Sequence, residues 1–135
     1  MRRPDQSDGP VVLDVSAVLA LPQNKAGAER DAALLSGGAM SAVNLSEVVA
    51  KLTDHGMPAD DIREALDGLP LDVHAFDREA TFVAGELRRV TRHAGLSLGD
   101  RACLASAVHL GVSAVTADRA WAALADAIAP VTLIR

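Results

Sequence analysis

The sequence predicts an α/β fold, a three-layer α/β/α sandwich in which helices cover both faces of a parallel sheet. Short apolar runs rich in β-branched residues alternate along the chain with longer helical patterns, and this alternation implies crossover connections between parallel strands. Half of the residues are apolar, whereas only 2% are aromatic and tyrosine is absent. The core must therefore be built from small aliphatic side chains, which favours helices packed on a sheet.

The length of 135 residues corresponds to one domain. We expect a flexible leader at residues 1–9, where the chain is polar, and a single domain over residues 10–135. No internal repeat or linker divides this stretch. Because the sequence has neither an apolar run long enough to span a membrane nor a signal-peptide segment, we expect a cytoplasmic protein without a membrane partner.

The strand candidates are apolar runs bounded by Gly, Pro or Asp. The clearest are Val11–Val15, Ser113–Thr116 and Val131–Ile134, and the weaker ones are Ala39–Val43 and Leu71–Phe76. Helical patterns lie between them, at Ser16–Leu21, Lys25–Leu35, Leu45–His55, Ala59–Leu66, Arg78–His93, Leu98–Leu110 and Ala120–Ala127.

Four acidic residues lie where strands and helices meet. Asp14 ends the first strand, Glu47 opens the helix after the second, Asp100 begins the helix before the Ser113–Thr116 strand, and Asp118 follows that strand. In an open parallel sheet, ligands bind beyond the carboxyl ends of the strands. We therefore expect these four side chains to converge at one edge of the sheet.

Three of these acids also occupy positions typical of helix caps. Asn44 with Glu47, and Ser97 with Asp100, have the spacing of a capping box. Asp118 stands where an acid caps the helix that follows. For these three residues, capping and catalysis remain alternative interpretations of the sequence.

The four acids differ in the burial that the sequence predicts. Asp14 lies in an apolar strand, where a carboxylate is costly to bury unless something binds it. Asp100 belongs to a stripe that should face the core, together with Leu104, Ala107 and Val108. Glu47 is predicted on the far side of its helix from the apolar stripe, which consists of Leu45, Val48, Val49 and Leu52. Its position at the start of the helix is what would let Glu47 reach the other acids.

Clustered carboxylates without histidine or cysteine ligands suit Mg²⁺ or Mn²⁺, which bind through oxygen donors and keep some of their water. Such ions activate water and stabilise the charge on the attacking and leaving oxygens of a phosphodiester. The acids therefore predict a metal-dependent nuclease. The sequence does not predict a zinc site, because its four histidines are not paired at the spacing of metal ligands, such as i and i+4 on one helix: His55, His74, His93 and His109. The single cysteine, Cys103, has the pattern of a small buried hydrophobic residue.

The net charge of −5 counts against a nucleic-acid partner, because affinity for phosphates comes from a basic surface. That objection weakens if the four acids surround metal ions, since the remainder of the chain is then nearly neutral. The scarcity of aromatic residues disfavours a surface on which bases stack.

The segments that carry these acids resemble the bacterial PIN-domain toxins called VapC. The matching segments are Leu13–Ala20, Asn44–Val48, Leu96–Ala105 and Val115–Trp121. They occur in the order typical of the family, and the similarity extends over Val11–Arg135. The resemblance implies a PIN fold with a five-stranded parallel sheet, an RNA substrate, and Mg²⁺ or Mn²⁺ as cofactor.

The resemblance also implies roles for individual residues. The catalytic acids of the family correspond to Asp14, Glu47, Asp100 and Asp118. Asp14 and Asp100 would coordinate the metal directly, and Glu47 and Asp118 directly or through water. Ser16 and Thr116 match polar residues that support the acids with hydrogen bonds. Family members usually form homodimers and are inhibited by a cognate VapB-type antitoxin, whose basic side chain would complement the acidic pocket.

Other functions use similar residues. A phospho-acceptor signalling module would need an acidic pair after the first strand and a lysine after a late strand, but the only lysines are Lys25 and Lys51. A non-catalytic binding module would use the same acids as ordinary helix caps. A nuclease that processes RNA, rather than acting as a toxin, would use the same site.

Overall fold

The computed structural model describes residues 11–20, 37–125 and 128–133. The predicted leader at residues 1–9 and the predicted helix Lys25–Leu35 lie outside the described residues. The described elements are β1 (Val12–Leu13), α1 (Val15–Ala20), β2 (Ala39–Ser41), α3 (Ala42–Asp54), α4 (Ala59–Asp67), β3 (Asp72–His74), α5 (Arg78–Glu86), α6 (Arg88–Thr91), a 3-10 turn (Arg92–Ala94), α7 (Leu98–Leu110), β4 (Ala114–Thr116), α8 (Arg119–Ala125) and β5 (Val131–Leu133). None of the helices in those ranges is long and apolar enough to cross a bilayer.

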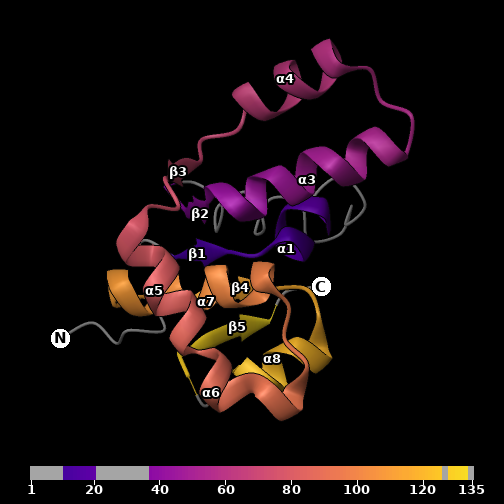
Figure 1. Ribbon diagram of the computed structural model, residues 1–135. Coiled ribbons are helices and arrows are strands. Elements are labelled where there is room, and N and C mark those ends of the chain that lie inside the picture. The colour runs from indigo at the N-terminus through magenta and orange to yellow at the C-terminus, as the bar shows by residue number, and fades with distance from the viewer. Residues whose placement is uncertain (1–10, 21–36, 126–127, 134–135) are drawn as a thin grey trace, which may run out of the picture.

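The strands form one five-stranded parallel sheet in the order β3-β2-β1-β4-β5 (Figure 1). β1 lies at the centre, because Val12 pairs with Ala39 of β2 on one side and with Ala114 of β4 on the other. The chain runs from β1 to β2 and β3, and later returns to β4 and β5 on the opposite side of β1. Strand order therefore reverses between β1 and β4, which is where such sheets form a ligand crevice.

Helices cover both faces of the sheet, as the sequence predicted. Neighbouring residues of a strand point to opposite faces. Leu13 belongs to a core cluster that also contains Met40, Val48 and Val115. Val12 belongs to a second cluster that also contains Ala39, Cys103, Ala114 and Trp121. Val48 of α3 packs on the face of Leu13, and Trp121 of α8 packs on the face of Val12, so the three-layer α/β/α architecture is confirmed.

The strands are shorter than predicted. The expected strand Val11–Val15 is reduced to Val12–Leu13, so Asp14 lies just after the strand and not within it. At the sheet edge, Leu71–Phe76 is reduced to Asp72–His74. The remaining residues of the two predicted strands belong to the connections and to the start of α1. A short run of apolar residues does not distinguish such segments from a strand.

The helix after β2 begins earlier than predicted. The expected strand Ala39–Val43 ends at Ser41, whose hydroxyl accepts a hydrogen bond from Val43 N at 3.2 Å as the N-cap of α3. Ala42 and Val43 are therefore helical. The capping box predicted from Asn44 and Glu47 is wrong for the same reason, because Asn44 lies inside the helix.

The single helix predicted over Arg78–His93 is also wrong, because the chain forms α5, α6 and a 3-10 turn instead. Thr91 donates both its N–H, at 3.1 Å, and its hydroxyl, at 2.9 Å, to Leu87 O. The segment ends at Gly95, whose φ of 69° is a left-handed conformation that favours glycine. This bend brings Leu96 into the core cluster of α7.

Candidate active site

A pocket of about 590 Å³ opens at the carboxyl ends of the central strands. All four predicted acids line it: Asp14, Glu47, Asp100 and Asp118. Asp14 directly follows β1, and Asp118 lies two residues after the end of β4, so the reversal of strand order places both in the crevice. The first turn of α7 supplies Asp100, and the second turn of α3 supplies Glu47. The structure thus brings together the acids that the sequence singled out.

Asp14 is the most buried of these acids, with 7% of its surface exposed. Thr116 Oγ1 donates to Asp14 Oδ2 at 2.6 Å, while Ser16 Oγ and Ala17 N donate to Oδ1 at 2.8 and 2.9 Å. The bond from Ala17 makes Asp14 the N-cap of α1. The sequence did not predict this cap, because the apolar residues on both sides of Asp14 were interpreted as one continuous strand.

The hydroxyls of Ser16 and Thr116 connect the turns after β1 and β4. Each hydroxyl donates its single proton to Asp14 and accepts a hydrogen bond from a backbone N–H of the turn after β4. Ala117 N donates to Ser16 Oγ at 2.9 Å, and Asp118 N donates to Thr116 Oγ1 at 3.0 Å. The Asp14 carboxylate is therefore held in one orientation by two side chains that are themselves fixed.

Burial raises the pKa of Asp14 above its usual value of 3.8, and the negative charge of Asp100 contributes in the same direction. Hydrogen bonds from Thr116, Ala17 and Ser16 favour the ionised form and oppose the rise in pKa. Because burial outweighs them, the ionised carboxylate is held at an electrostatic cost that a nearby cation would offset.

Asp100 is both a cap and a pocket residue. Its N–H donates to Ser97 Oγ at 3.1 Å, and its Oδ2 accepts the N–H of Ser97 at 3.0 Å, which completes the capping box at the start of α7. Its carboxylate still lines the pocket, because the capping bond occupies only one of its two oxygens. The stripe predicted for this helix is right at Leu104 and Ala107, which are buried, and wrong at Val108, which is 49% exposed.

Glu47 faces the pocket, contrary to the prediction that it lies on the far side of its helix. The buried face of α3 centres on Asn44 and Val48, while the predicted core residue Val49 is 37% exposed. Asn44 Nδ2 donates to Glu47 Oε1 at 3.1 Å and to Gly99 O, on α7, at 2.9 Å. A polar residue, Asn44, thus occupies the centre of the buried face. The prediction considered only apolar residues, and it therefore placed the buried face of α3 too far from Glu47.

Asn44 and Gly99 are site residues that the sequence analysis missed. Asn44 Oδ1 is buried and, among the described residues, has no hydrogen-bond partner. A Cβ added at Gly99 would collide with the carboxylate of Glu47, so α7 approaches α3 closely only because this residue is glycine. For Gly99, the sequence signal was its position directly before Asp100 in the first turn of α7, where a glycine lowers helix propensity.

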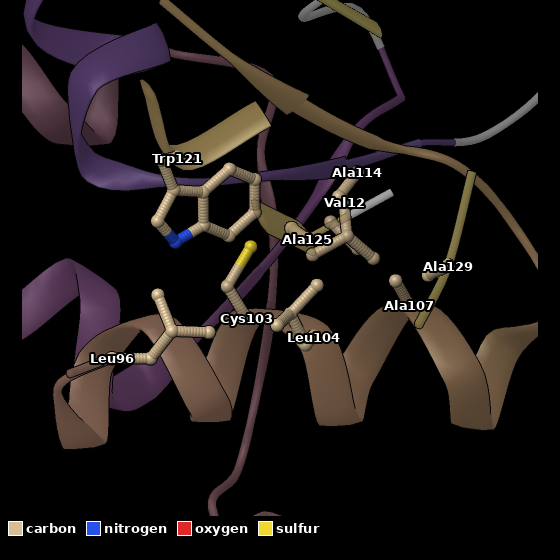
Figure 2. Packing of buried hydrophobic residues seen from close by; sticks show 10 residues of the cluster. Val12, Leu96, Cys103, Leu104, Ala107, Ala114, Trp121, Ala125 and Ala129 are labelled. Carbon is tan, nitrogen blue, oxygen red and sulfur yellow. The ribbon is translucent and has the colours of Figure 1, made fainter. Parts of the chain in front are cut away.

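Asp118 caps α8 and is anchored to the core through Trp121. Its Oδ1 accepts the N–H of Trp121 at 3.1 Å. The Trp121 ring is buried and packs beside Cys103 of α7, with Leu96 nearby (Figure 2). The helix that carries Asp118 is therefore fixed directly to the helix that carries Asp100.

The donor set fits Mg²⁺ or Mn²⁺, since it consists of carboxylate oxygens. The carboxylates line one pocket. Burial raises the pKa of the nearby Cys103 thiol well above its usual value, and the charges of Asp14, Asp100 and Glu47 add to the rise. Within the described residues, however, no three such side chains converge as a finished set of metal ligands. Asn44 and Ser97 N hold Glu47 and Asp100 by hydrogen bonds that a metal ion would compete with.

Several solved structures with a similar fold come from toxin–antitoxin systems. VapBC2 from Rickettsia felis bound to a promoter DNA fragment has a chain that is 18% identical, with a TM-score of 0.73 over 94% of this chain and 100% of that one. VapBC-5 from Mycobacterium tuberculosis has a chain that is 24% identical, with a TM-score of 0.57 over 93% and 98%. A toxin–antitoxin complex from Klebsiella pneumoniae has a chain that is 18% identical, with a TM-score of 0.64 over 80% and 86%.

No curated protein sequence matches the chain. The family model of the PIN domain, in contrast, matches residues 11–127, which include all four acids of the pocket and every strand except β5. The order of the strands, the placement of the acids and this match agree with one another. The chain belongs to the PIN domain family.

Proposed function

We propose that this protein is a metal-dependent endoribonuclease and the toxin of a VapBC-type toxin–antitoxin pair. PIN domains are nucleases that generally use divalent metal ions. The observation that carries the proposal is the pocket at the reversal of strand order, which is lined by Asp14, Glu47, Asp100 and Asp118. The similarity in fold to chains of solved toxin–antitoxin complexes supports the toxin role.

In this proposal, Asp14 and Asp100 would hold Mg²⁺ or Mn²⁺ directly, and Glu47 and Asp118 would hold it directly or through water. When bound there, such an ion would supply an activated water and stabilisation of the charge on the phosphodiester oxygens. Ser16 and Thr116 keep the Asp14 carboxylate oriented by donating hydrogen bonds to its two oxygens. Asn44 sets the position of Glu47 relative to the start of α7.

The partners follow from the charge of the pocket. A cognate antitoxin with a basic side chain would occupy it and exclude the metal, since opposite charges at an interface are complementary. We further propose that the protein forms a homodimer, as VapC toxins usually do. An RNA-processing nuclease is the alternative function, and a small gene immediately upstream, encoding a protein with an Arg-containing tail, would favour the toxin.

The test is cleavage of a mixed cellular RNA pool by purified protein, freed of any copurified antitoxin, with Mg²⁺, with Mn²⁺ and with EDTA. Asp14→Asn and Asp100→Asn serve as matched controls, because each removes one charge and almost no volume. We expect discrete fragments with the metals and none with EDTA or with either variant. Circular dichroism should show that both variants stay folded. The absence of cleavage by the wild-type protein under every condition would favour a non-catalytic binding module.

A further inference from the structure

We infer that Lys51 binds the RNA phosphate adjacent to the one that is cleaved. The inference rests on the proposed ribonuclease function and assigns one wall of the same pocket. Lys51 lines the pocket together with the four acids, and among the described residues that line it, Lys51 is the one lysine or arginine. A phosphodiester strand that enters a pocket lined with carboxylates is repelled wherever no cation stands beside it.

The helix α3 presents three residues in a row along this wall. Glu47, Lys51 and His55 are spaced at four-residue intervals, and all three line the pocket. Residues at this spacing lie on one face of a helix, about 6 Å apart along its axis. The wall therefore runs from the metal-binding acids outward, so that a strand with one phosphate at the acids passes Lys51 with the next.

The pocket lining and the geometry of α3 place the Lys51 side chain beside the acids. Glu47 Oε1 accepts from Asn44 Nδ2 at 3.1 Å, toward α7. Lys51 is exposed, and a helical side chain leans toward the N-terminus of its helix, which for Lys51 is the direction of Glu47 and the acids. His55 Nδ1 donates to the backbone carbonyl of Lys51 at 2.7 Å, which fixes the imidazole at the outer end of the wall.

The experiment compares wild type, Lys51→Gln and Lys51→Arg on a short single-stranded RNA that contains a cleavage site mapped in the RNA pool. Arg63→Gln is the matched control, because Arg63 is an exposed cation on α4 that does not line this pocket. We expect Lys51→Gln to raise KM with little change in kcat, which is the signature of lost binding that is equal in ground and transition states. Lys51→Arg should restore most of the affinity, and Arg63→Gln should match wild type.

Neutral phosphate analogues identify the contact. A single methylphosphonate is placed in turn at each linkage next to the cleavage site. At one of these linkages, it should weaken the binding of the RNA to wild type. At the same linkage, it should leave the binding of the RNA to Lys51→Gln unchanged. The slope of log K against log salt should fall by about 0.7 in Lys51→Gln, the value for one phosphate of a single strand. A purely structural lysine would change neither quantity.

Failure of the inference and failure of the proposed function are distinguishable. If wild type cleaves RNA and Lys51→Gln has the same KM, the same salt slope and the same response to every methylphosphonate, the assignment of Lys51 is overturned. If wild type does not cleave, the ribonuclease proposal fails and no cleavage site is defined, so equilibrium binding of an unmodified single-stranded RNA by wild type and by Lys51→Gln decides about Lys51. A salt slope that depends on Lys51 then supports the assignment, and no RNA binding overturns it.

Discussion

At the scale of single residues, the same carboxylates both cap helices and line the pocket. Asp14 caps α1, Asp100 completes a capping box, and Asp118 caps α8. A capping bond to a backbone N–H occupies only part of the hydrogen-bonding capacity of a carboxylate. The sequence left capping and catalysis open at Asp100 and Asp118, and both residues cap a helix while their carboxylates line the pocket.

Asp14→Asn tests the electrostatic cost of the buried acid. Its pKa is raised on folding, so the charged form costs stability at every pH above the raised value, and the cost disappears as the pH falls below the unfolded value of 3.8. Without metal, the variant should therefore be more stable than wild type near neutral pH, and the difference should shrink in acid. Urea unfolding in EDTA at several pH values measures this. A difference that grows as the pH falls would contradict the burial argument.

Gly99→Ala tests the close approach of α7 to Glu47. The new methyl group should push the flexible carboxylate out of place and lower RNA cleavage by roughly tenfold or more, the effect of disturbing the surroundings of a metal ligand. Stability should change by less than about 1 kcal/mol, because glycine and alanine differ by that amount in a helix. The matched control is Gly85→Ala on α5, where a Cβ meets nothing within 4 Å. Equal cleavage by both variants would show that the position of Glu47 is unimportant.

At the scale of elements, the starts of helices deliver three of the four acids. The chain leaves a strand of the parallel sheet and immediately enters a helix at Asp14 and at Asp118, whereas α7 runs back toward β4 and therefore begins at the same edge with Asp100. The partial positive charge of each helix start favours a carboxylate there. Glu47 is the exception, because α3 reaches the pocket one turn further along.

Ser97→Ala separates the cap of α7 from the proposed catalytic role of Asp100. The variant loses the hydroxyl that accepts Asp100 N, and it should lose about 1 kcal/mol of stability. Cleavage should be retained, because the backbone N–H of Ser97 still holds the Asp100 carboxylate. Asp77→Ala, which removes the N-cap of α5, should have a similar effect on stability. Chemical denaturation and cleavage rates are compared for both, and a large loss of cleavage in Ser97→Ala alone would show that its hydroxyl positions Asp100.

At the scale of the whole molecule, the two faces of the sheet have different cores. The face covered by α7 and α8 contains alanines of β2 and β4 and the ring of Trp121, and Cys103 lies in this cluster with none of its surface exposed (Figure 2). Small side chains let α7 lie close to the strands. That approach places Asp100 in the same pocket as Asp14.

Cys103 reports on metal binding without any measurement of cleavage. Burial raises the pKa of its thiol, so a thiol reagent should react only when the core opens. Mg²⁺ at about ten times its Kd should slow labelling of wild type by about tenfold, because a ligand of the folded state lowers the population of the open state. Asp14→Asn should show little slowing. Labelling that is unaffected by Mg²⁺ or Mn²⁺ in the wild type would contradict the metal site.

The sequence by itself determined the α/β class, the helix α7 to the residue, and the set of acids that the pocket contains. These features are local, because the pattern of a strand, of a helix or of an acid at the end of a strand is contained in a short stretch of the sequence. The parallel sheet follows from the alternation of the elements, and it carries the acids to one edge.

Only the tertiary structure decided how the acids are held. The bonds between Asp14 and Thr116 and between Asn44 and Gly99 O join residues separated by 102 and 55 positions in the chain. The contact to Gly99 O holds Asn44 at the buried face of α3, and Asn44 in turn holds Glu47 at the pocket. Burial of a polar group depends on whether a distant partner satisfies it, and a local pattern of hydrophobic letters does not contain that partner.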